Sequence, residues 1–186
     1  MPVVALSWDL AVVVFFAILM SLGFILGKNR IITVIIASYI AVIATEGIGR
    51  VLARLTGHGS GLFESMGVPV DPILLSLAKI FLFALCAGVF VLKSGIDVSH
   101  KKDAGSIVTI VLTGLLGFSL SGLIASTILS YAAGSSLLTS GFLPASVAGP
   151  QLHKGTLAVL LILNQDLWYA LPAFLIVTIG FIKNSE

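Results

Sequence analysis

The chain consists of long apolar runs separated by short polar breaks, and this pattern predicts helices that cross a membrane. An α-helix needs about 20 apolar residues to cross the hydrocarbon core of a bilayer. A helix on the surface of a soluble core would instead carry polar residues along one face. Four runs of the required length come first, and they predict spans near residues 10–26, 31–50, 73–92 and 106–131.

The connection between the first two spans is very short. Gly27-Lys28-Asn29-Arg30 follows the first run, and the second run begins at Ile31. Such a connection leaves no room for a crossover, so we expect the second helix to return antiparallel beside the first.

The last apolar region, residues 156–182, is interrupted by the three polar residues Asn164-Gln165-Asp166. Polar side chains in the middle of a membrane helix are costly, so we expect the helix to break there. A short fifth span then covers residues 167–182, roughly 24 Å at 1.5 Å per residue. Residues 137–163 combine apolar side chains with Gly, Ser and Pro, and we expect them to lie at the interface or to re-enter the membrane.

Composition strengthens the membrane interpretation. Of the 186 residues, 58% are hydrophobic and only 10% are charged, whereas soluble proteins carry about 25% charged residues. We therefore expect an all-α, polytopic bundle of four or five spans, forming a single domain over residues 1–186 and embedded in a lipid bilayer. The formal net charge of +2 offers no field that would recruit nucleic acid.

The basic residues predict the orientation, because Lys and Arg gather in cytoplasmic loops. With the N-terminus outside, the inner side carries more of them: Lys28, Arg30, Lys93, Lys101, Lys102 and Lys183 lie inside, and Arg50, Arg54 and Lys154 lie outside. The expected topology is therefore N-out and C-in. It places five aromatic and acidic residues at the outer headgroup level as interface anchors: Trp8, Asp9, Asp166, Trp168 and Tyr169.

Glu46 is the acidic residue that needs an explanation. It lies roughly 22 Å along the second span, still within a hydrocarbon core about 30 Å thick, whereas Arg50 reaches the boundary. Lys79 lies at a similar depth in the third span, so we predict an ion pair of Glu46 with Lys79, or of Glu46 with Arg50. Two alternatives stay open. The charges form a proton- or ion-coupled site, or Lys79 faces the headgroups.

The fourth span carries small residues at intervals of four, and such stripes let helix backbones approach closely. The stripe comprises Thr113, Gly114, Gly117, Ser121, Gly122 and Ala125. We expect this helix to be the packing centre of the chain. Self-association along the same stripe and a pore lining are the alternatives.

Signals for chemistry are missing or incomplete. His58-Gly59-Ser60-Gly61 resembles a serine-hydrolase motif, but His58 occupies the position that needs glycine. The three histidines, His58, His100 and His153, have no ligand spacing, and the single Cys86 has no partner for a disulfide. Phosphate-binding glycine motifs are absent from the sequence. We therefore expect a protein without catalytic residues, metal or cofactor.

Two blocks of sequence resemble the colicin V production protein (CvpA) family of bacterial inner-membrane proteins. The first is Trp8-Asp9-Leu10, the apolar run with Ser21-Leu22-Gly23-Phe24, and the turn Gly27-Lys28-Asn29-Arg30. The second is Lys93-Ser94-Gly95-Ile96-Asp97 through Gly105, followed by Gly114, Gly117 and Gly122. Two features differ from the family: Ser121 stands where arginine is expected, and a fifth span follows the fourth.

The resemblance implies a multi-pass protein of the inner (cytoplasmic) membrane that is connected with export or envelope maintenance. The resulting hypothesis is a non-enzymatic scaffold or accessory factor, whose partners are a second copy of the chain or export and envelope proteins. The alternative is a small transporter or channel that uses Glu46 and Lys79, with Asp166 as a further polar residue on the path.

Overall fold

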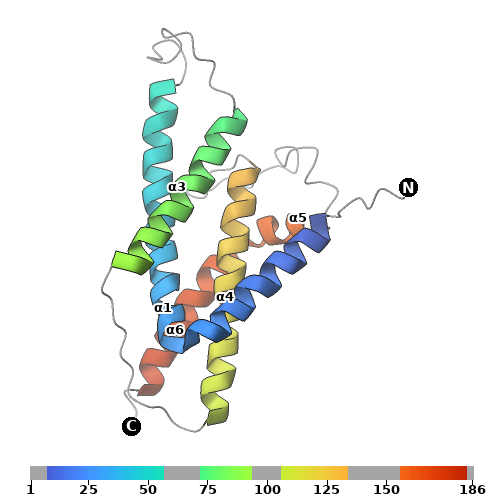
Figure 1. Ribbon diagram of the computed structural model, residues 1–186, viewed down its shortest axis with the longest axis vertical. Coiled ribbons are helices and arrows are strands. Elements are labelled where there is room, and N and C mark those ends of the chain that lie inside the picture. The colour runs from blue at the N-terminus through green and yellow to red at the C-terminus, as the bar shows by residue number, and fades with distance from the viewer. Residues whose placement is uncertain (1–7, 57–71, 94–105, 134–155, 184–186) are drawn as a thin grey trace, which may run out of the picture.

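The computed structural model describes residues 8–56, 72–93, 106–133 and 156–183, and the regular structure within these ranges is entirely α-helical (Figure 1). The expected all-α class is confirmed for this part of the chain. The helices, as labelled in Figure 1, are α1 (Trp8–Thr56), α3 (Pro72–Lys93), α4 (Ser106–Ala132), α5 (Thr156–Leu163) and α6 (Gln165–Lys183).

Three of the described helices contain segments that are long and apolar enough to cross a membrane: Asp9–Val51, Ser76–Lys93 and Thr109–Ala132. Helices α5 and α6 pass the same test only as a pair, and they form a fourth span if the bend between them is counted as a break within one span. The described helices are therefore compatible with a membrane protein.

Helix α1 bends sharply at Gly27, the one residue within it that has non-helical dihedral angles (φ 75°, ψ 163°). Its 49 residues would extend roughly 74 Å if straight, more than twice the thickness of the hydrocarbon core. The bend instead gives two arms that diverge from Gly27 like a V (Figure 1). The connection expected over residues 27–30 is thus reduced to Gly27 alone, because glycine accepts a positive φ without a steric penalty.

Helix α4 lies at the centre and packs against all four of the other described helices. Just over half, 56%, of an 18-residue apolar segment of α4 is buried, compared with 6% of such segments in α1 and α3, so α4 is the core helix of the described bundle. The backbones of α1 and α4 approach closely where Gly23 of α1 faces Gly117 of α4. A methyl group on Gly23 would come within 3.1 Å of the Gly117 Cα.

Asn164 joins α5 to α6 at a bend of 66°. Its side-chain amide donates to the Leu160 carbonyl over 2.9 Å, which closes α5. Its own carbonyl accepts hydrogen bonds from the backbone N–H groups of Leu167 and Trp168, which opens α6. The break expected at residues 164–166 therefore lies at Asn164, and α6 begins at Gln165, two residues earlier than the expected span.

At its other end, α5 is tied to the start of α1. The Asp9 carboxylate accepts a hydrogen bond of 2.8 Å from the Leu157 N–H in the first turn of α5. A helix leaves its first N–H groups without partners inside the helix, and its N-terminus carries a partial positive charge. The Asp9 carboxylate accepts from one of these N–H groups and places a negative charge at the helix N-terminus. It also joins two segments that are far apart in the sequence.

The bend predicts that Gly27→Ala destabilises the protein by roughly 1–3 kcal/mol, because an L side chain is strained at this φ and ψ. A methyl group at Gly27 would have open space, so the loss would report backbone strain alone. Equilibrium unfolding in bicelles measures the effect. The exposed Gly180, which also has open space around it, gives the control Gly180→Ala. Equal stability of the two variants would contradict the role of Gly27.

The contact between Asp9 and α5 predicts that Asp9→Ala exposes the first turn of α5, at a cost of about 0.5–2 kcal/mol, as for other helix caps. Hydrogen exchange of the α5 amides should accelerate in this variant. Asp166→Ala, which alters an exposed carboxylate in the first turn of α6, should leave α5 exchange unchanged.

Candidate functional site: polar residues around Glu46

The second arm of α1 presents one buried face to the bundle, with residues at the helical intervals of three and four: Ser38, Ala41, Val42, Thr45, Glu46 and Gly49. Glu46 is only 1% exposed, which places its carboxyl group inside the bundle. Arg50, one turn later, is exposed, and the side chain of Arg54 lies outside the described part of the structure.

Lys79 of α3 points toward this face at Gly49. A methyl group on Gly49 would lie 2.9 Å from Cε of Lys79, so the missing side chain makes room for the lysine stem. The ammonium then lies 5.7 Å from the ring centroid of Tyr131 in α4, within the range of a cation–π interaction. The Glu46 carboxylate also interacts electrostatically with the Tyr131 phenol. Glu46 and Lys79 therefore have Tyr131 as a common neighbour, and the ion pair between them stays a prediction.

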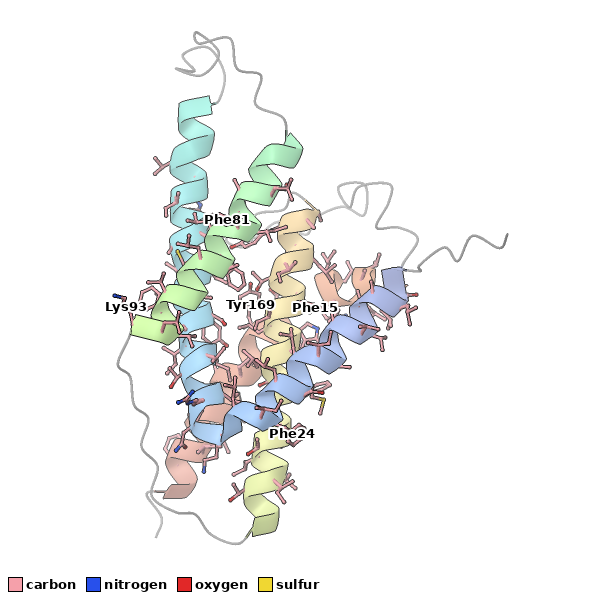
Figure 2. All side chains as sticks on the ribbon, viewed as in Figure 1. Phe15, Phe24, Phe81, Lys93 and Tyr169 are labelled. Atoms are coloured by element: carbon pink, nitrogen blue, oxygen red, sulfur yellow. The ribbon has the colours of Figure 1, made fainter. Side chains whose placement is uncertain are left out.

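Tyr169 connects three helices inside the bundle (Figure 2). Its hydroxyl is 2.6 Å from the Thr127 hydroxyl of α4, and the Tyr39 hydroxyl of α1 donates to its backbone carbonyl. Glu46 interacts electrostatically with the Tyr169 phenol as well. The sequence predicted Tyr169 as an interface anchor; the structure places its hydroxyl in an interhelical network, because the bend at Asn164 turns the start of α6 toward α4.

Pro172 lies within α6, close to the carbonyl that accepts a hydrogen bond from Tyr39. Proline within a helix has no N–H to donate, and it disturbs the carbonyl groups of the preceding turn. In a membrane, neighbouring helices must satisfy the groups that are freed. The Tyr39 hydroxyl reaches the Tyr169 carbonyl, three residues before the proline.

Trp168, another predicted anchor, packs against α4 at Gly122. A methyl group on Gly122 would overlap the indole at 1.8 Å from Cε3, so glycine is required for this contact. The ring also stacks edge-on or tilted against Phe16 and Phe118, at centroid distances of 6.1 and 5.4 Å. The indole is therefore part of the packing between α1, α4 and α6.

The remaining predicted residues have simpler surroundings. In the stripe on α4, Gly117 faces Gly23 of α1, and the ring of Phe24 approaches Gly114. Thr113, Ser121 and Ala125 are buried. Asp166 is exposed, whereas the side chain of Trp8 lies outside the described part. The stripe thus serves contacts within the chain, and self-association along it stays a prediction.

Sequence reasoning missed Tyr39, Thr127 and Tyr131. The available signal was their polar oxygen within otherwise apolar runs, which in a membrane requires a partner. Together these groups can hold helices in place or bind a proton. Within the described ranges, no three His, Cys, Asp or Glu side chains gather as metal ligands do, and His58, His100 and His153 lie outside those ranges.

No protein-family model, curated protein or solved structure matches the chain. The functional interpretation therefore depends on the geometry of the bundle and on the residues of the sequence.

The contact at Gly49 predicts that Gly49→Ala moves the Lys79 ammonium while the fold is kept. The stem of lysine is flexible, and alanine favours the helix, so the stability should change by no more than roughly 1 kcal/mol. Labelling of Lys79 by a small amine-reactive probe, followed by mass spectrometry, should change severalfold. Gly47→Ala is the matched control, because Gly47 is exposed and has open space around it. If both variants label like the wild type, Gly49 does not position Lys79.

Proposed function

We propose that this chain is a five-span protein of the bacterial inner membrane, with its N-terminus outside and its C-terminus inside. The directions of its segments support this topology. The two arms of α1, then α3, α4 and α6, run alternately down and up in Figure 1. Lys28, Lys93 and Lys183 then follow the segments that run inward, as expected for basic residues on the cytoplasmic side.

We further propose that the protein is a non-enzymatic scaffold or accessory factor in export or envelope maintenance. The observation that carries this proposal is that interior polar groups join different helices. Tyr39, Tyr169 and Thr127 connect α1, α6 and α4. The Ser126 hydroxyl of α4 donates to the Leu161 carbonyl of α5, and the Ser130 hydroxyl donates to Gln165 of α6 over 3.1 Å.

Such connections suit a scaffold, because interhelical hydrogen bonds in a bilayer fix the arrangement of helices. A bundle with a fixed arrangement presents a constant surface to lipid and to partners. The resemblance of residues 8–30 and 93–122 to the colicin V production protein family supplies the biological setting. The proposed partners are a second copy of the chain or envelope and export proteins.

A small transporter or channel is the second candidate, and one observation favours it. Glu46 is 1% exposed in the bundle, and ionisable residues inside membrane proteins often mark the paths of ions or protons. Lys79 would be its counter-charge in that case.

Glu46→Gln separates the two functions. If the charge is structural, the amide should weaken assembly by about 1–3 kcal/mol, because the groups around it lose a charged partner. Purified in a mild detergent, the variant should then be less stable to unfolding than the wild type and should lose the complex with its proposed partner. The matched control is Asp166→Asn, the same chemical change on an exposed carboxylate.

Proteoliposomes with a pH gradient supply the opposing readout. The scaffold proposal expects no flux in the wild type. Flux that is lost in a fully assembled Glu46→Gln variant would instead establish transport.

A further inference from the structure

Two buried hydroxyl groups, Thr45 Oγ1 and Tyr131 Oη, have no hydrogen-bond partner in the part of the chain that the structure describes. Both residues are 0% exposed. Other buried hydroxyls in the bundle are satisfied: Thr113 donates to the Thr109 carbonyl of its own helix, and Thr127 contacts both the Leu123 carbonyl and Tyr169. A buried hydroxyl without a partner destabilises the folded state, so these two groups require an explanation.

The two groups belong to the same region of the bundle. Tyr131 packs in one cluster with Ala41, Val42 and Phe83. Ala41 and Val42 precede Thr45 by four and three residues, so all three lie on the buried face of α1. The Tyr131 phenol also interacts electrostatically with Glu46, the residue next to Thr45. The junction of α1, α3 and α4 therefore collects two hydroxyls and a carboxylate.

We propose that Thr45, Tyr131 and Glu46 form a binding site for one buried water molecule. The water accepts hydrogen bonds from both hydroxyls and donates one to the Glu46 carboxylate. Three hydrogen bonds are typical of a buried water in proteins. A carboxylate offers about four acceptor positions, so Glu46 can bind the water and keep its other interactions.

Charge selects water over a metal cation at this site. The Lys79 ammonium, 5.7 Å from the Tyr131 ring centroid, already brings a positive charge to the junction. A bound cation would set a second positive charge beside one carboxylate, and that repulsion is strong where little solvent screens it. A neutral molecule with two donors and two acceptors avoids the repulsion. This inference is independent of whether the bundle serves as a scaffold or as a transporter.

A double-mutant cycle of Thr45→Val and Tyr131→Phe tests the site, because both substitutions remove only a hydroxyl function. If a water connects the two groups, each substitution should lower the stability, and the second should cost less once the first has been made. The unfolding constants in bicelles should then depart from multiplicative behaviour by about threefold or more.

Two further cycles calibrate the result. Thr127→Val with Tyr169→Phe removes a direct contact of 2.6 Å and should couple strongly. Thr113→Val with Tyr131→Phe should not couple, because Thr113 bonds to its own helix. The proposal is wrong if Thr45→Val and Tyr131→Phe each leave the stability equal or higher and act independently, since that is how dry hydroxyls behave.

A measurement on the wild-type protein guards against variants that fail to fold. The chain has 3 tyrosines, so ring signals from labelled tyrosine are easily separated in solid-state NMR. Tyr39 and Tyr169 make direct hydrogen bonds to the protein. The proposal instead places a water at the Tyr131 hydroxyl, so transfer of magnetisation from slowly exchanging water to the Tyr131 ring is expected. Its absence would also overturn the proposal.

Discussion

The fold depends on close packing around α4, which is possible because this helix has glycine at the points where other helices contact it. Gly117 lets the backbone of α1 approach at Gly23, and Gly122 leaves the space that the Trp168 indole occupies. Lipid chains are as apolar as a protein core, so apolar burial alone does not drive helices together in a bilayer. Close packing at small residues and hydrogen bonds between helices decide the arrangement instead, and α4 takes part in both.

Two bends direct α1, α5 and α6 onto α4, and they use different chemistry. At Gly27 the backbone adopts dihedral angles that only glycine tolerates well, so α1 folds back without a loop. At Asn164 a side-chain amide closes one helix while the carbonyl of the same residue opens the next. The second bend brings Tyr169 to Thr127 and Gln165 to Ser130, so the interior polar contacts depend on it.

The polar interior and the buried charge occupy neighbouring positions. Glu46 interacts electrostatically with both Tyr131 and Tyr169, and Tyr169 in turn is hydrogen-bonded to Thr127 and Tyr39. A change at Glu46 therefore acts on groups that join α1, α4 and α6. In a scaffold, Glu46 would help to hold these helices in place. In a transporter, movement of these helices would change the surroundings of Glu46.

The sequence by itself determined the helical membrane class, the break near Asn164 and the small-residue stripe, because run length, polar interruptions and residue size are local properties. Only the tertiary structure decided which faces turn inward, and so which residues surround Glu46. In a soluble helix the polar face marks the outside. Here the exposed faces of the helices carry many large apolar side chains, so polarity does not mark the outside. The partners of Tyr39, Thr127 and Tyr131 therefore depend on bends and close contacts between residues distant in the sequence.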